Sequence, residues 1–145
     1  MKPVVCVDLD GTLAKFDEWQ GVDHFGDPFP GAVEFTKKLS DFFDVCIYTC
    51  RCNEKINPPE KSNLLKNRVR DWLDEHGFVY SHIYAEQGKP IAHAYIDDKG
   101  ISCQPDLNGE EAYNMVLRIL GVLGSPQVEE VATAIEVSEE MDKEE

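Results

Sequence analysis

Two aspartates in the stretch "VVCVDLDGTLAKF", residues 4–16, have the most evident capacity for chemistry. An apolar run leads directly into Asp8, and Asp10 follows after a single leucine, with Gly11 and Thr12 next in the chain. Like carboxylates a few ångströms apart cannot all stay ionised without compensation. A hard divalent cation supplies it, and Mg²⁺ prefers carboxylate oxygen, carbonyl oxygen and water. The stretch therefore predicts a cation site at the end of a buried strand.

Polar residues also follow two later apolar runs. "CIYT", residues 46–49, ends in Thr49, and "AYIDD", residues 94–98, ends in Asp97 and Asp98. In open parallel sheets, ligands bind outside the carboxyl ends of the strands, where strand order reverses. We therefore expect Asp8, Asp10, Asp97 and Asp98 to converge at one sheet edge as the residues that hold Mg²⁺.

A cation at this edge would draw a phosphate group into the site. Thr49, Arg51 and Lys89 offer a hydroxyl, a guanidinium and an ammonium group to its oxygens. Gly11 allows a tight backbone turn, so that amide hydrogens beyond Asp10 can also face the anion. For Arg51 a surface salt bridge is an equally open interpretation.

Apolar strands that alternate with amphipathic helices predict an α/β fold with a parallel sheet and helices on both faces. The expected strand order is 3-2-1-4, since strands one and four must be neighbours if Asp8 and Asp97 share one cation. Residues 13–30 have no clean period and form an irregular excursion. We expect strands at 4–8, 45–49, 79–85 and 93–97, and helices at 31–43, from a cap at Asn57 to a stop at Gly77, and at 110–121.

Length, composition and charge narrow the class of protein. The 145 residues suit one domain, and 42% of them are hydrophobic. No apolar run approaches the roughly 18 residues of a membrane span, and no signal-peptide pattern is present, so a cytoplasmic location is expected. The net charge of −14 disfavours nucleic acid and anionic membranes as partners. Oligomeric state stays open.

Half of the net charge lies in a short C-terminal segment. Residues 125–145 carry eight acidic residues and one lysine, which gives 1 − 8 = −7. We therefore expect a catalytic domain at 1–124 and an acidic tail at 125–145. The tail is interpreted as a solubilising end or as an amphipathic helix that docks on another surface.

Four short motifs resemble those of one enzyme family. "VDLDGTL", residues 7–13, is similar to the first motif of the haloacid dehalogenase (HAD) superfamily, in its phosphatase branch. "CIYT", "GKP" at 88–90 and "AYIDD" look like its second, third and fourth motifs, in the same order. The resemblance covers about residues 3–105. It implies a three-layer Rossmann-like fold with no large cap domain.

The same resemblance implies a Mg²⁺-dependent phosphatase that acts on a small phosphorylated substrate through an aspartyl-phosphate. Asp8 matches the nucleophile, and Asp10 matches a general acid and base that binds metal through its backbone carbonyl. Asp97 matches a direct metal ligand, and Asp98 a water-mediated ligand or an orienting acid. The catalytic set is completed by Thr49 and Lys89, and the residues expected to bind substrate are Gly11, Thr12, Thr49, Arg51 and Lys89.

Other interpretations use the same residues differently. A non-catalytic module on this fold could bind a phosphorylated ligand, and a nucleotide or nucleic-acid end phosphatase would use the same chemistry. An EF-hand is excluded, because its loop needs glycine sixth and glutamate twelfth, whereas here glycine is fourth and Trp19 is twelfth. In the excursion, Trp19, His24 and Phe25 suit either packing of a flap or contact with substrate.

Overall fold

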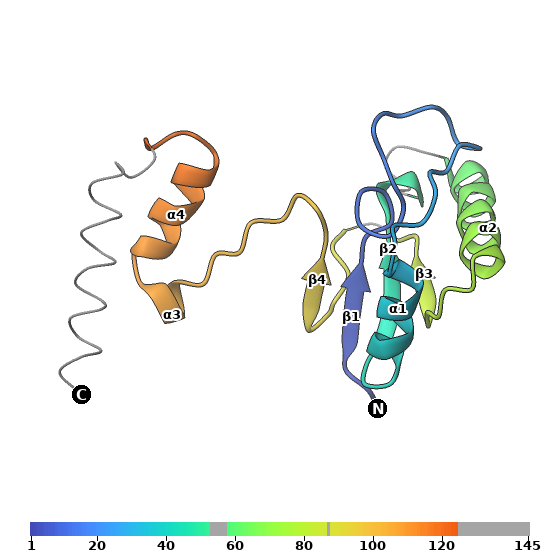
Figure 1. Cartoon of the computed structure of the whole chain (residues 1–145), viewed down its shortest axis with the longest axis horizontal. Coiled ribbons are helices and arrows are strands. Elements are labelled where there is room, and N and C mark those ends of the chain that lie inside the picture. The colour runs from blue at the N-terminus through green and yellow to red at the C-terminus, as the bar shows by residue number, and fades with distance from the viewer. Residues whose placement is uncertain (53–57, 87, 125–145) are drawn as a thin grey trace. The chain divides into compact units, whose positions relative to one another are not determined.

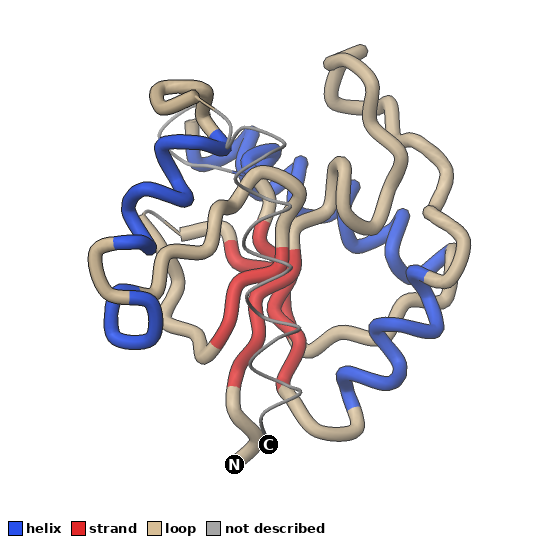
Figure 2. Tube along the Cα trace, turned by 60° about the vertical axis from the view of Figure 1, so that its left-hand side comes forward, coloured by secondary structure: helices blue, strands red, loops and turns tan. Residues whose placement is uncertain are grey.

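Four parallel strands form the central sheet of this α/β protein. We describe residues 1–52, 58–86 and 88–124 of a computed structural model. The strands are β1 (Val4–Val7), β2 (Asp44–Tyr48), β3 (His82–Tyr84) and β4 (Ala94–Ile96), in the order β3-β2-β1-β4. Figure 1 shows them side by side, and Figure 2 shows them in red. Val7 pairs with Ile47 on one side and Ile96 on the other, so the expected strand order is confirmed.

One face of the sheet packs against two helices, α1 (Ala32–Ser40) and α2 (Pro59–Glu75). Alternate strand residues point to the same face. Val5, Val7, Val45, Ile47 and Ile83 accordingly share one apolar core. The helices contribute to this core through Ala32 of α1 and through Leu65, Val69, Trp72 and Leu73 of α2. Burial of this set fixes the helices against the sheet.

The connection after β1 folds back on itself before the chain reaches α1. The amide groups of Leu13 and Ala14 both donate to the Leu9 carbonyl, at 2.9 and 3.0 Å, and all three side chains are buried. Residues 15–27, which we call the flap, are closed at their base, because the Lys15 amide donates to the Asp27 carbonyl at 2.8 Å. The predicted irregular excursion is therefore confirmed, with its two ends held together.

A second compact unit begins at Ile101, after the first unit of Met1–Gly100. Its described part holds α3 (Pro105–Asn108) and α4 (Glu111–Ile119). The helix expected at 110–121 is confirmed as α4, whereas α3 was not predicted. Because the second unit is described by itself, its helices are not assigned to a face of the sheet. Helices on both faces of the sheet, and a domain boundary at residue 124, therefore stay predictions. The acidic tail lies outside the described residues.

The other expected elements are found with shorter bounds, except β2, which has the expected length and begins one residue earlier. The strand predicted at 79–85 is limited to β3, because Val79 still contacts α1, with its amide 3.4 Å from the Thr36 hydroxyl. A 3₁₀ turn, η1 (Cys50–Cys52), follows β2. The helix stop at Gly77 is confirmed, since this residue has φ 79° and its amide donates to the Asp74 carbonyl. The predicted cap at Asn57 lies outside the described residues, and α2 begins after Pro58.

No helix among the described residues has the length and apolar character needed to span a membrane.

Candidate active site

Asp8 directly follows β1, and its side chain is partly buried. Its amide donates to the Ile96 carbonyl at 2.9 Å, which joins the end of β1 to the end of β4. Its Oδ1 accepts the Leu9 amide at 2.8 Å. Burial raises the pKa of Asp8 to about 6, against the lowering effect of that hydrogen bond. The carboxylate is therefore held in an environment that disfavours its charge.

Three further carboxylates also disfavour the ionised form of Asp8. The negative charges of Asp98, Asp10 and Asp97, in that order, also raise the pKa of Asp8. Gly11, at φ 85°, lies so close to Asp98 that an added Cβ would meet the Asp98 carboxyl carbon at 2.9 Å. The structure thus brings the acids that follow β1 and β4 to one sheet edge, as the sequence predicts.

The acids do not form a closed metal cage. Asp97 Oδ1 accepts the backbone amides of Lys99, at 2.9 Å, and of Gly100. Among the described residues no group of three or more His, Cys, Asp or Glu side chains is arranged to hold a metal ion. The donor chemistry does fit Mg²⁺, because a partly buried carboxylate with a raised pKa and acidic neighbours is stabilised by a hard cation. Asp8 and Asp97 each accept backbone amides through Oδ1, so their Oδ2 atoms are the oxygens that they could offer to a cation.

Asp10 forms a two-point ion pair with Arg51 of η1. Arg51 Nε donates to Asp10 Oδ2 at 2.6 Å, and Nη2 donates to Oδ1 at 3.0 Å. The side chains are 3% and 15% exposed for Arg51 and Asp10, respectively. Arg51 is therefore not a surface residue, and its guanidinium holds both oxygens of the expected acid and base.

Arg51 also joins the flap to the sheet. Its Nη2 donates to the His24 carbonyl at 2.8 Å. Its Cζ lies 4.8 Å from the centre of the Trp19 ring and 4.3 Å from that of Phe25. Phe25 in turn stacks on Trp72 of α2, with ring centres 5.9 Å apart. The packing interpretation of the flap thus holds for Phe25, and a single arginine connects the flap, η1 and Asp10.

A pocket of about 440 Å³ opens beside the carboxylates. Thr49 is buried at the end of β2, and its hydroxyl oxygen accepts the Arg51 amide at 3.3 Å. The flap and the first turns of α2 provide most of the apolar lining. The lining residues are Asp8, Asp10, Phe16, Trp19, Val22, Thr49, Cys50, Arg51, Lys61, Leu65 and Lys99.

Of the residues expected to bind phosphate, Thr49 and Arg51 line this pocket and the others do not. Lys89 does not line it, and its Nζ lies 4.2 Å from the centre of the Tyr95 ring. Thr12 does not line it either, although its Oγ1 is buried without a hydrogen-bond partner among the described residues. Lys61 and Lys99 do line it, and sequence reasoning missed both. Lys99 directly follows the paired acids, which was an available signal, whereas nothing marked Lys61.

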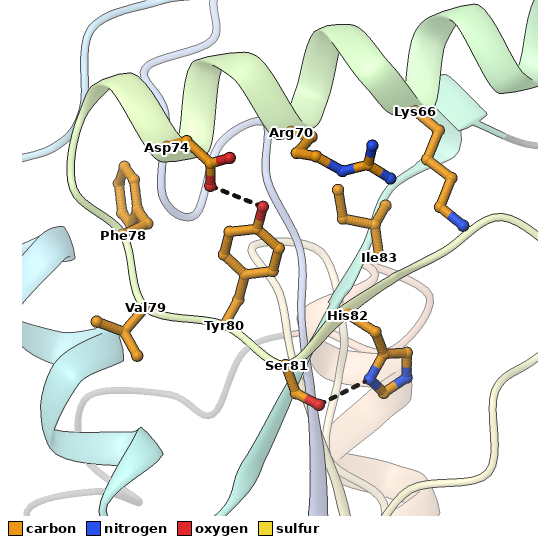
Figure 3. Close-up of a pocket in the computed structure, with 9 residues that line it drawn as sticks. All are labelled: Lys66, Arg70, Asp74, Phe78, Val79, Tyr80, Ser81, His82 and Ile83. Atoms are coloured by element: carbon orange, nitrogen blue, oxygen red, sulfur yellow. Dashed lines mark hydrogen bonds between the residues drawn. The ribbon is translucent and has the colours of Figure 1, made fainter.

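Figure 3 shows a second pocket, of about 570 Å³, between α2 and β3. Lys66, Arg70 and His82 are among its lining residues, and Tyr80 donates to Asp74 there at 2.8 Å. Burial, followed by the hydrogen bond to Asp74, raises the pKa of Tyr80 to about 12, which makes it a poor acid or base near neutrality. The described residues that line this pocket include no pair of carboxylates, so the 440 Å³ pocket is the better candidate site.

Comparisons with known proteins add little to this geometry. No family model matches the chain, and no curated protein matches it by sequence. One similar solved structure is a D,D-heptose 1,7-bisphosphate phosphatase from B. bronchiseptica, complexed with magnesium and phosphate. The match has a TM-score of 0.40 and 18% identity, and it covers 83% of this chain but 64% of that chain. This chain therefore spans less than two thirds of that protein, and we base no argument on the likeness.

Binding of Mg²⁺ should depend on pH through Asp8. Its pKa of about 6 exceeds the ordinary 3.8, so the folded protein without a cation loses stability as pH rises between these values. Mg²⁺ binds the ionised carboxylate, and below about pH 6 it must displace a proton. Mg²⁺ should raise the melting temperature more at about pH 7.5 than at about pH 5. Scanning calorimetry with and without Mg²⁺ measures this difference.

The matched control is Asp71→Asn on the exposed side of α2, which should respond to Mg²⁺ as the wild type does. Asp8→Asn should lose most of the response. An equal response at both pH values, or an unchanged response in Asp8→Asn, would show that Mg²⁺ does not bind through Asp8.

The ion pairs Arg51–Asp10 and Arg68–Asp23 should contribute unequally to stability. Arg51→Ala leaves the largely buried Asp10 without its ion-pair partner and should cost about 3–5 kcal/mol of unfolding free energy. Arg68→Ala removes an exposed ion pair with Asp23 and should cost less than about 1 kcal/mol. Urea unfolding of both variants provides the comparison. Similar small losses for both would mean that Arg51 does not anchor the flap.

Proposed function

We propose that the protein is a Mg²⁺-dependent phosphatase of the HAD type that hydrolyses a phosphate monoester through an aspartyl-phosphate on Asp8. The observation that carries this proposal is the meeting of Asp8, Asp10 and Thr49 at one pocket, with the pKa of Asp8 raised by burial and by neighbouring acids. The order of the four sequence motifs supports the same reaction.

In the first step a carboxylate oxygen of Asp8 attacks phosphorus. A bond forms between that oxygen and phosphorus while the bond from phosphorus to the ester oxygen breaks. Thr49 donates its hydroxyl to a phosphate oxygen from the buried end of β2. Mg²⁺, held by Asp8, Asp97 and the Asp10 backbone carbonyl with Asp98 nearby, would reduce the repulsion between the two anions.

Asp10 handles protons in both steps. It protonates the departing ester oxygen, then takes a proton from the water that hydrolyses the aspartyl-phosphate. Arg51 fixes the position of Asp10 through both carboxylate oxygens, at 2.6 and 3.0 Å. A protonated carboxyl donates one O–H and accepts only weakly at that oxygen, so one of the two bonds from Arg51 should weaken when Asp10 serves as the acid.

Two lysines are candidates for neutralising the phosphate group, Lys89 and Lys99. The third motif assigns this role to Lys89, whose Nζ now lies over Tyr95. Lys99 lines the pocket, with its Nζ 3.5 Å from Asp98 Oδ2. We therefore propose two alternatives for the lysine that neutralises the phosphate: Lys89, on the basis of the motif, and Lys99, on the basis of its position at the pocket.

A non-catalytic module that binds a phosphorylated ligand is the alternative. The observation that favours it is the engagement of both Asp10 oxygens by Arg51, which would suit a fixed structural pair. The two proposals differ in turnover: a phosphatase should hydrolyse a generic phosphate ester in the presence of Mg²⁺ and lose this activity when Mg²⁺ is chelated.

Asp10→Asn should distinguish an acid and base from a structural carboxylate. Both steps should slow, by about 10²–10⁴-fold for loss of a positioned acid or base. The loss on the first step should be smaller for 4-nitrophenyl phosphate than for an alkyl phosphate, because nitrophenolate leaves without protonation. Burst kinetics with the two esters measures the first step separately.

Asp8→Asn is the companion variant and should abolish turnover of both esters, since an amide cannot form the phosphorylated intermediate. Equal first-step losses for the two esters in Asp10→Asn would contradict the role of Asp10 as a general acid. Unchanged turnover in Asp8→Asn would contradict the proposed function itself.

A further inference from the structure

The 440 Å³ pocket has an apolar side that the phosphatase chemistry does not use. Phe16, Trp19 and Val22 of the flap line it together with Leu65 of α2. Phe16 is 37% exposed and Trp19 is 53% exposed. Large aromatic side chains that are exposed in a pocket indicate a ligand-binding surface, because a ligand that covers them removes apolar area from water, which is favourable.

The Trp19 ring rests on a fixed support. The Arg51 guanidinium lies 4.8 Å from its centre, and this arginine is 3% exposed and bonded to both Asp10 oxygens. The other ring contact of Arg51 is with Phe25, which stacks on Trp72. An aromatic side chain held in place before binding loses little conformational freedom when a ligand stacks on it.

Apart from Lys61 and Cys50, the polar side chains that line the pocket already have a role at the phosphate end. Asp8, Asp10, Thr49 and Lys99 belong to the chemistry proposed above, and Arg51 is bonded to Asp10. Among the described residues, the side chains of the apolar wall offer one hydrogen-bond group, the indole N–H of Trp19, to the several hydroxyls of an open-chain sugar or polyol. Hydroxyls buried there without partners would weaken binding, whereas a flat ring would gain contact area.

We propose that the substrate is a phosphate monoester whose alcohol part carries a planar aromatic ring, which stacks on Trp19 while the phosphate meets Asp8. This inference rests on the proposed phosphatase function. A pocket of about 440 Å³ is within the range of small-molecule sites, so the ring belongs to a compact ligand. A nucleoside monophosphate and an aryl-alkyl phosphate share this chemistry.

The test uses pairs of esters with the same kind of leaving oxygen. Adenosine or thymidine 5′-monophosphate is compared with ribose or deoxyribose 5-phosphate, respectively, in which a hydroxyl replaces the base. Phenylethyl phosphate is compared with butyl phosphate. The ring-bearing member of at least one pair should have a kcat/KM about 10- to 100-fold higher, the usual scale of stacking by one aromatic side chain. The pair of esters with the larger ratio of kcat/KM values shows whether the site prefers a nucleoside or an aryl-alkyl group.

Trp19→Ala should remove this preference, and Trp19→Phe should restore most of it. A purely structural effect through Arg51 would lower both members of a pair equally, so the ratio is the diagnostic quantity. Phe16→Ala, which should reduce the ratio, is the second variant if Trp19→Ala does not fold. Phe42→Ala removes an aromatic ring that is 71% exposed and does not line the pocket, and it should leave the ratio unchanged.

Binding of the same esters, measured by calorimetry with Mg²⁺ present, separates this inference from the proposed function. Hydrolysis of both members of each pair with equal kcat/KM would overturn the ring preference and leave the phosphatase proposal standing. Tighter, Trp19-dependent binding of the ring-bearing esters without hydrolysis would support the ring site and overturn the phosphatase proposal. Equal binding without hydrolysis would overturn both.

Discussion

Repulsion among the carboxylates at the ends of β1 and β4 is the constraint on which the site depends. The backbone forces it: the Asp8 amide bonds the Ile96 carbonyl, so the acids that follow the two strands emerge together. Gly11 adds to the crowding, because the turn after Asp10 passes against Asp98 with no room for a side chain. Burial raises the pKa of Asp8 to about 6, and the neighbouring carboxylates add to this effect, an arrangement that favours a bound cation and, through it, an anionic substrate.

Arg51 relieves part of this repulsion in a way that also organises the flap. Its guanidinium neutralises Asp10 at two points and stacks between Trp19 and Phe25. The same side chain therefore sets the position of the proposed acid and base and of the pocket's aromatic wall. This coupling explains how a segment without regular secondary structure, residues 15–27, can hold a defined position. Its base is closed by the hydrogen bond from the Lys15 amide to the Asp27 carbonyl, and its far side is held by the hydrogen bond from the buried Arg51 side chain to the His24 carbonyl.

The strand order could be predicted, because it follows from local patterns: apolar strands, and acids where two of those strands end. That the four acids hold one cation stays a prediction. The bonding of Arg51 could not be predicted, since its partner Asp10 is 41 residues away and no spacing rule connects them. The flap contacts of Trp19 and Phe25 and the lining role of Lys61 depend likewise on tertiary packing. Lys89 illustrates the converse: its motif predicts a phosphate contact, while its side chain lies over Tyr95, so the motif indicates a role that side-chain position alone does not.

The central claim is that Asp8 becomes phosphorylated during turnover, and the most direct measurement is mass spectrometry of the acid-quenched protein. Asp10→Asn protein is mixed with 4-nitrophenyl phosphate and Mg²⁺, because loss of the base in the second step should let the intermediate accumulate. The account predicts one added phosphoryl group, located on the peptide that contains Asp8, that is absent when Mg²⁺ is chelated. Turnover of the wild-type enzyme with no phosphoryl group on Asp8 under any of these conditions, or with the group on another residue, would contradict it.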